Sequence, residues 1–224
     1  DREFGDGVHD FMYLPVTSPF TGKVWLNHNL GADYTNVNHT SFSPNQQAMA
    51  ENDHHAYGSH YQWGRYSDGH ELISWTSSTT GALVNTTTTT LSTGDTPGHN
   101  HYIKDSTSPY DWRIPENDNL WQATGINNPC PEGFHVPTSE EWVAERDNFS
   151  PQTSVGALNS VLKLTLPGLV YRNGSLINMG KYSYYWSSTI DGTEDSVDLH
   201  TRDNAANLSS NPRVYGYTVR CIQD

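Results

Sequence analysis

Acidic and amide side chains crowd the stretch between positions 191 and 207. Oxygen atoms at this density suit calcium, which takes about six to eight oxygen ligands. We predict calcium ligands at four of these positions: Asp191, Asp195, Asp203 and Asn204. Calcium is therefore the one cofactor that the sequence suggests. The alternative is a solvated acidic loop without an ion.

A block at 54–70 combines aromatic rings, histidines and charged side chains. Proteins recognise ligands such as sugars with a mostly apolar contact surface and a few directed hydrogen bonds. The ligand contacts that we predict come from this block and from one later tryptophan: Tyr61, Trp63, Arg65, Asp68, His70 and Trp186. The alternative is that the block is framework, with Arg65 and Asp68 forming an internal ion pair.

Motifs typical of enzymes are missing from the sequence. Several histidines lie near one another, but they form no His-Glu-x-x-His motif and match no closed zinc site. There is no Gly-x-Ser-x-Gly elbow. Many carboxylates are present, yet none is marked as half of a glycosidase pair. We therefore expect a binding protein that is not an enzyme.

The chain has two cysteines, Cys130 and Cys221. Cys130 opens the run CPEGFHVPT, and Cys221 lies in a strand-like segment near the C-terminus. A disulfide between them would close a loop of roughly 90 residues and contribute about 4–5 kcal/mol in the chain-entropy model. Such a disulfide implies an oxidising compartment. Two buried free thiols are the alternative.

Charge and hydropathy exclude several partner classes. The formal net charge is -13, and no cluster of Lys and Arg is present, so we expect no nucleic-acid partner and no docking on anionic lipid. No stretch approaches the roughly 20 apolar residues of a membrane span, so we expect no direct membrane insertion. Because the chain starts at Asp1 without Met, we expect a fragment of a longer exported protein.

The elements that position these residues are predicted to be short. Hydrophobic patterning predicts strands at 23–30, 184–188, 196–201 and 214–222. Asn173-Gly174, between 169–171 and 175–177, is a strong hairpin signal. Residues 33–53 are rich in Asn, Ser and Thr and predict a long loop, while 74–97 predicts an exposed loop or edge strand.

Two helices complete the predicted set of elements. Thr138 and Glu141 have the spacing of a capping box, which predicts a helix that ends near Asn148. Apolar residues between 154 and 164 fit one face of a second helix, and Pro167 would end it. Two helices with several short strands and long loops indicate the α+β class.

Motifs along the chain resemble one protein family. TGKVWLNHNLGA at 21–32, YGSHYQWGRYSDGHE at 57–71, CPEGFHVPTSEEW at 130–142, YYWSST at 184–189 and YGYTVRCI at 215–222 resemble the Fibrobacter succinogenes major paralogous domain family. The resemblance implies a C-type lectin-like fold over residues 17–224 as a single domain. Residues 1–16 would then be a linker that leads into the domain, or a junction with a fibre shaft.

The resemblance also bears on the predicted sites. It places Cys130 and Cys221 in the two segments expected to form the structural bridge, and it puts the acidic stretch where C-type lectins have their sugar-binding loops. The chain departs from those lectins at Trp186-Ser187-Ser188, where a calcium-dependent lectin would carry Trp-Asn-Asp. Their sugar-coordinating calcium arrangement therefore cannot be transferred by resemblance.

We expect an adhesin or receptor-binding module, secreted or displayed on a bacterial surface. Its expected ligand is a glycan on another cell, bound with the help of calcium if the acidic stretch holds an ion. The first alternative is a protein-binding or assembly domain, such as the homotrimeric tip of a fibre that contacts a surface protein. The second alternative is a metal-dependent enzyme.

Overall fold

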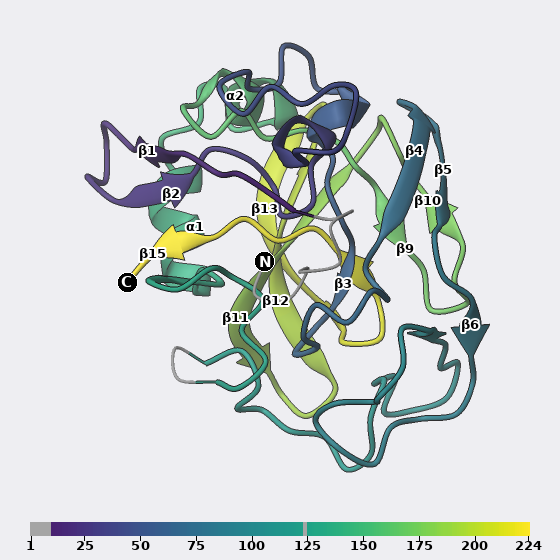
Figure 1. Cartoon of the computed structure of the whole chain (residues 1–224). Helices are drawn as coiled ribbons and strands as arrows, with labels where there is room; N and C mark the ends of the chain where they lie inside the picture. Colours follow the sequence, from purple (N-terminus) through teal and green to yellow (C-terminus); the bar gives the residue numbers. More distant parts are fainter. Residues whose placement is uncertain (1–9, 123–124) are drawn as a thin grey trace.

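The computed structural model describes residues 10–122 and 125–224, and most of the regular secondary structure in them is β-strand. The longest strands form an antiparallel sheet in the order β11-β12-β13, with β11 at Ser183–Asp191, β12 at Asp195–Arg202 and β13 at Ala205–Pro212. Figure 1 shows these strands in the middle of the molecule. Two helices, α1 (Ser139–Arg146) and α2 (Ser154–Asn159), contact this sheet.

Two four-stranded sheets join the N-terminal third of the chain to its C-terminal end. The first contains β1 (Pro15–Thr17), β2 (Val24–Leu26), β15 (Ile222–Gln223) and β8 (Phe134–His135) in this order. The second contains β10 (Leu176–Ile177), β9 (Leu169–Val170), β14 (Gly216–Tyr217) and β3 (Tyr61–Gln62). The β9–β10 pair confirms the predicted hairpin around Asn173-Gly174.

The predicted strand at 214–222 is two short strands, β14 and β15, separated by four residues. Between them the backbone changes partners: the Thr218 carbonyl accepts from Trp186 N, and the Val219 carbonyl accepts from Leu30 N. The chain thus crosses from one sheet to the other while its polar groups stay paired, as buried backbone requires. Pattern alone shows the apolar alternation but not this exchange of partners.

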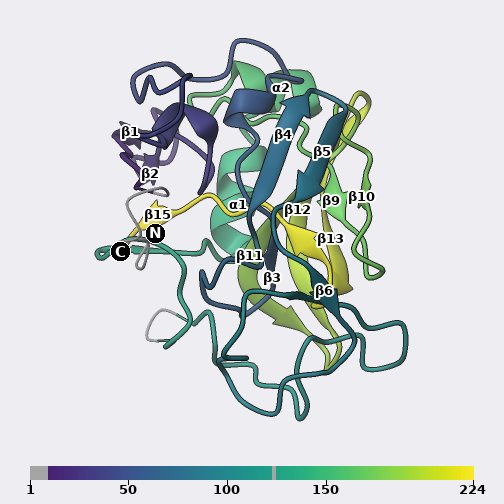
Figure 2. The same ribbon diagram turned by 45° about the vertical axis from the view of Figure 1, so that its right-hand side comes forward.

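Residues 74–97 contain a hairpin where the sequence predicted a loop or an edge strand. β4 (Ile73–Ser77) pairs antiparallel with β5 (Thr80–Leu83), and β6 (Thr87–Thr88) pairs in parallel with β7 (Tyr102–Ile103). Figure 2 brings the β4–β5 hairpin to the front. Trp75 Nε1 donates to the Gly58 carbonyl at 2.9 Å and holds the hairpin against the domain.

Residues 33–53 are the loop that was predicted, with one 3-10 turn, η1 (Asp33–Thr35), at its start. A second turn, η2 (His54–Ala56), follows it, and the two turns contact each other. Residues 10–16, predicted as part of a leading linker, are instead paired with the domain: Met12 N donates to the Thr35 carbonyl, and β1 pairs with β2. Residues 1–9 of that predicted linker lie outside the described residues.

The capping box of α1 is confirmed. Thr138 Oγ1 accepts from Glu141 N at 3.2 Å, and Glu141 Oε2 accepts from Thr138 N at 2.9 Å. These two bonds satisfy amide groups that a helix start leaves free. Helix α2 ends at Asn159, earlier than the predicted 164, because Ser160 already has an extended backbone with a ψ of 167°.

Tryptophans dominate the interior. Six of the seven are buried: Trp25, Trp63, Trp112, Trp121, Trp142 and Trp186. Three of these donate their indole N–H to carbonyls of one segment, 61–65, and so hold it in the core. Large rings with one polar atom can fill a core in this way when aliphatic residues are few, provided that the N–H finds an acceptor.

The predicted disulfide joins Cys130 and Cys221, and both residues are fully buried. It spans 91 residues of sequence, consistent with an oxidising compartment. The described residues thus form a mostly-strand domain with two short α-helices, several small sheets and one disulfide. Within them, the longest helices are far too short to cross a membrane.

Candidate functional site

Three aromatic residues predicted to contact a ligand belong to the core. The exposed fractions are 0% for Tyr61, 1% for Trp63 and 0% for Trp186. The Trp186 ring stacks on Tyr217 at 4.2 Å between centroids, and its Nε1 donates to the Tyr61 carbonyl at 2.8 Å. Trp63 Nε1 donates to the Ser187 carbonyl at 2.9 Å. Rings that are covered on all sides cannot stack on a sugar from solvent, so their predicted ligand role is corrected to packing.

Arg65 connects three segments from a fully buried position. Its Nε lies 2.9 Å from Asp68 Oδ2, so the predicted ion pair is confirmed. Its terminal nitrogens donate to the carbonyls of His99 and His101, each at 2.9 Å. Because a guanidinium is always charged and offers a rigid fork of donors, it can fix the Asp68 turn to the 99–101 loop. Arg65 itself has no exposed surface with which to reach a ligand.

His70 is held in one tautomer by its neighbours. Gln62 N donates to His70 Nε2 at 3.1 Å, so this nitrogen carries no proton. His70 Nδ1 therefore carries the proton and donates to Asp68 Oδ1 at 2.7 Å. Glu71 Oε2 lies 3.2 Å from the same nitrogen and accepts from Gly69 N. Both ring nitrogens are thus committed inside the protein, and the predicted ligand contact from His70 is corrected to a supporting role.

Asp68 is the one predicted contact of this block whose carboxylate reaches the surface, with 23% of its side chain exposed. Its burial would raise the pKa, but the hydrogen bonds from His70 and Arg65, together with the charge of Arg65, outweigh that effect and lower the pKa to about 2. Asp68 is therefore ionised at neutral pH. It is also fixed in position, since each of its oxygens accepts a bond from a buried donor.

A hollow of about 570 Å³ opens beside this carboxylate. We call it the Asp68 hollow. It lies between the turn after β3 and the loop before β7, and its walls are Tyr66, Ser67, Asp68, Thr96, Pro97, Gly98, His99 and Asn100. Tyr66 and His99 are half-buried, so part of each residue is available to solvent. The walls thus combine hydroxyl, amide, imidazole and carboxylate groups with one tyrosine.

Close packing behind the hollow fixes its two walls against each other. Gly69 has a φ of +97°, which glycine adopts without strain. A Cβ at this position would lie 3.0 Å from the Asn100 Cβ and 3.3 Å from Asn85 Nδ2. Asn85 Nδ2 also donates to the Gly69 carbonyl at 2.9 Å. The turn and the loop therefore approach as closely as a residue without a side chain permits.

The four predicted calcium ligands do not converge. Asp191 and Asp195 pair across the β11–β12 turn, whereas Asp203 and Asn204 follow the other end of β12. The eight residues of β12 separate the two pairs by about 25 Å at the usual rise of a strand. Ligands of one calcium ion lie within about 5 Å of each other. The predicted four-residue site is therefore corrected to two separate pairs, and the region that seemed a loop contains β13.

Crowding and burial raise the pKa values of two acidic residues on β12. Desolvation raises the pKa of Asp195, and the like charges of Glu194 and Asp191 raise it further. Asp198, in the middle of the strand, is fully buried, and burial raises its pKa to about 8. Asn211 Nδ2 donates to Asp198 Oδ1 at 2.7 Å, while Oδ2 has no partner among the described residues. Asp198 thus keeps its proton at neutral pH.

Comparisons of the chain with protein-family models, with curated proteins and with solved structures gave no match. The resemblance to the Fibrobacter succinogenes major paralogous domain family therefore stays a prediction that rests on the motifs quoted above.

Sequence reasoning missed most of the walls of the Asp68 hollow. Tyr66, Ser67 and Asp68 lie in the block at 54–70, but residues 96–97 fall in the stretch predicted as an exposed loop or edge strand, and 98–100 lie outside every predicted element. The Thr-Pro-Gly turn at 96–98 was the available signal, since turns of this kind form fixed loops on which binding residues are often carried.

Proposed function

We propose that this chain is an extracellular binding module that recognises a carbohydrate in the Asp68 hollow. The observation that carries the proposal is an ionised carboxylate, fixed by buried partners, in the wall of a surface hollow next to a half-exposed tyrosine ring. The volume lies within the range of roughly 300–1,000 Å³ typical of small-molecule sites.

The groups in the walls match the chemistry of a sugar. A tyrosine ring offers an apolar face, and its hydroxyl can exchange hydrogen bonds with the ligand. Asp68 Oδ1 accepts from the backbone N and from Nδ1 of His70, and Oδ2 accepts from Arg65. A carboxylate has about four acceptor positions, so one remains on Oδ2 for a sugar hydroxyl. Asn100 and His99 can supply donors.

Charge narrows the ligand class. The Asp68 carboxylate is negative, the chain has a net charge of -13, and the nearest cation, Arg65, has its donors committed inside the protein. Sialylated or sulfated sugars would be repelled by this surface. The ligand that fits is a neutral sugar or an amino sugar.

The finer fold assignment and the location belong to the same proposal. We assign the domain to the C-type lectin-like fold of secreted or surface-displayed bacterial proteins. The ordered motifs, the Cys130–Cys221 bridge and the two short helices support this assignment. The disulfide supports export, since such bonds persist in oxidising compartments.

A glycan array tests the ligand class. We expect hits among neutral or amino sugars, with equal signals in calcium and in chelator, because the predicted calcium ligands lie apart at the two ends of β12. Titration calorimetry with the best hit then locates the site. Tyr66→Ala and His99→Ala should each weaken binding about tenfold or more, which corresponds to ~1.4 kcal/mol.

A matched control comes from a different hollow, of about 320 Å³, which is lined in part by the half-buried Tyr182. Tyr182→Ala should leave sugar binding unchanged. Sugar binding that survives both Tyr66→Ala and His99→Ala would contradict the proposed site. An array without hits, together with a trimer detected by light scattering, would instead favour the assembly function.

A further inference from the structure

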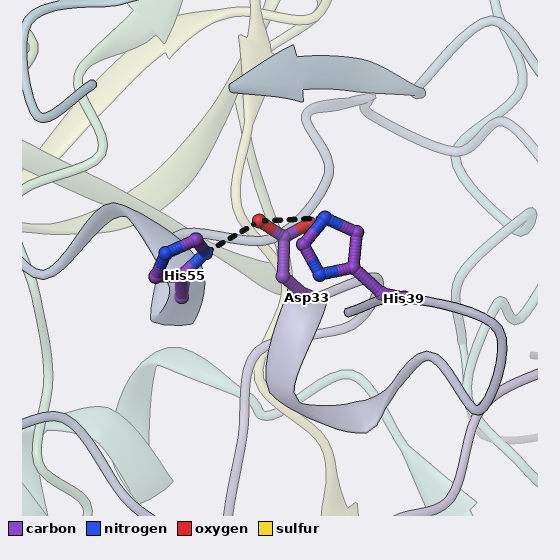
Figure 3. A group of neighbouring side chains, drawn as sticks. All are labelled: Asp33, His39 and His55. Atoms are coloured by element: carbon purple, nitrogen blue, oxygen red, sulfur yellow. Dashed lines mark hydrogen bonds and ion pairs between the residues drawn. The ribbon is translucent and has the colours of Figure 1, made fainter. Parts of the chain in front are cut away.

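A second group of polar side chains lies where the 33–53 loop meets η2. Asp33 Oδ2 is 3.0 Å from His55 Nδ1 and 3.8 Å from His39 Nε2. Figure 3 shows both imidazole rings directed at the same carboxylate. One potential ligand atom from each residue lies within 4.8 Å of the other two. We call Asp33, His39 and His55 the open cluster, because all three are partly exposed to solvent.

The distances suit a small ion. Nitrogen and oxygen ligands lie about 2.0–2.1 Å from zinc, so two ligands of a tetrahedral ion are about 3.4 Å apart. The separations of 3.0 and 3.8 Å fall on either side of that value. The side chains of His39 and His55 are 35% and 33% exposed, so small movements of either ring meet little resistance from packing.

The ring nitrogens of His39 and His55 can bind an ion with the loss of few hydrogen bonds. Among the residues that the structure describes, His55 Nδ1 is hydrogen-bonded only to Asp33, which would itself be a ligand, and Nε2 can carry the ring proton. His39 Nδ1 accepts from Ser41 N at 3.1 Å. Binding an ion through Nε2 would place the proton on Nδ1, so this bond must break. Ser41 is half-buried, and water can take over its amide.

We propose that the open cluster binds one divalent transition-metal ion of the zinc class through Asp33 Oδ2, His39 Nε2 and His55 Nδ1. Two imidazoles and one carboxylate favour such an ion over calcium or magnesium, which prefer oxygen ligands only. The net charge of -13 also favours accumulation of cations at the surface.

Three protein ligands leave a coordination position open. A hollow of about 190 Å³ adjoins the open cluster, and Asp33 and His39 form part of its wall together with Ser59 and the half-buried Trp75. Zinc sites that keep a position for water or for a ligand have this arrangement of three protein ligands. The ion would therefore face the hollow and could coordinate an oxygen or nitrogen atom of a bound molecule.

The ion would also tie two turns together. Asp33 begins η1, His39 lies in the loop after it, and His55 belongs to η2. An ion that binds only the folded protein stabilises it by mass action. We therefore expect zinc to raise the unfolding temperature of the intact chain, and a chelator to reverse the change.

Calorimetric titration of chelator-treated protein with zinc chloride tests the proposal, and cobalt(II) absorption spectra give a second readout of coordination. We expect one ion per chain. His39→Gln and His55→Gln should each weaken zinc binding tenfold or more and remove the rise in unfolding temperature. His101→Gln is the matched control, because His101 is half-buried beside His99 but belongs to no such cluster among the described residues.

Circular dichroism of the metal-free variants shows whether they fold. If a histidine variant does not fold, Asp33→Asn replaces it, since an asparagine keeps an acceptor for His55 but loses the charge; it should also bind zinc at least tenfold more weakly. Zinc binding of unchanged affinity in folded variants of His39 and His55, or binding abolished by His101→Gln, would overturn the proposal.

Discussion

Two groups of histidine and carboxylate side chains in this domain have similar composition and different surroundings. Asp68, His70 and Glu71 form the buried cluster, in which the side chains of His70 and Glu71 have no exposed surface. The open cluster, Asp33, His39 and His55, lies at the surface beside a hollow. In both groups the potential ligand atoms lie within 4.8 Å of one another.

The difference lies in how many hydrogen bonds are already made. In the buried cluster both ring nitrogens of His70 are hydrogen-bonded. An ion bound to Nδ1 would move the ring proton to Nε2 and leave the Gln62 amide without an acceptor in the interior. An unpaired buried amide costs about 1–3 kcal/mol. In the open cluster water can replace any bond that breaks. Availability to solvent, more than composition, therefore separates a framework cluster from a candidate site.

Removal of the charge that supports the buried cluster should have the largest effect. Arg65→Ala leaves the Asp68 carboxylate without its fully buried partner, and breaking such a pair costs about 3–5 kcal/mol. Urea unfolding of the purified variant measures this loss. Arg172→Ala is the control, because Arg172 lies over two tyrosine rings and has no ion pair among the described residues; we expect a loss of about 1 kcal/mol or less. Equal losses in the two variants would contradict the assigned role of Arg65.

Asp68→Asn should cost about 2–3 kcal/mol at neutral pH, because the pKa of Asp68 is lowered to about 2 from an ordinary value of 3.8. A lowered pKa means that the stabilisation is present above about pH 4 and is lost as the pH falls toward 2. Unfolding free energies of wild type and variant should therefore converge at low pH. Asp203→Asn, at an exposed turn, is the control, and it should change the free energy of unfolding at neutral pH by about 0.5 kcal/mol or less. A constant gap between wild type and Asp68→Asn from pH 7 to 2 would refute this explanation.

Asp198 is intermediate between the buried cluster and the open cluster. It is buried, but only one of its carboxyl oxygens has a hydrogen-bond partner among the described residues. Its pKa is raised to about 8, so the folded chain holds a proton that the unfolded chain loses above about pH 4. The free energy of unfolding should therefore fall as the pH rises from 4 to 8. Asp198→Asn cannot ionise and should be more stable than wild type at pH 8 by about 1–2 kcal/mol. A variant that is less stable than wild type at pH 8 would show that the carboxylate is better accommodated than its burial indicates.

A substitution in the open cluster should have the smallest effect on the free energy of unfolding when no metal is present. His55→Gln removes one partly exposed contact with Asp33, and such surface contacts contribute about 0.5 kcal/mol or less. Thermal unfolding of metal-free wild type and variant should nearly coincide. A loss of several kcal/mol would mean that this cluster is framework as well, and the contrast between the clusters would disappear.

Local spacing was enough to predict several features. The capping box at Thr138 and Glu141 and the Arg65–Asp68 pair depend on residues three positions apart, and the Asn173-Gly174 turn depends on a dipeptide. The Cys130–Cys221 bridge was predictable because the chain has no other cysteine. In each case the sequence leaves few alternative partners.

Burial and long-range convergence could not be read in the same way. The aromatic residues of the 61–65 segment look the same in sequence whether they line a site or fill a core. They lie in the core because tryptophans distant in sequence donate hydrogen bonds to the carbonyls of this segment. The acidic residues at 191–204 are close in sequence, but a strand carries the two pairs apart. Conversely, Asp33 and His55 are 22 positions apart and meet only because two turns pack together.

Long-range ¹H–¹⁵N NMR spectra of the histidine rings, recorded before and after one equivalent of zinc, test the contrast between the clusters most directly. The account predicts that the nitrogen resonances of His39 and His55 shift on binding. It also predicts that His70 remains protonated on Nδ1 and does not change. A zinc-dependent shift of the His70 nitrogens, or unchanged signals from His39 and His55, would contradict it.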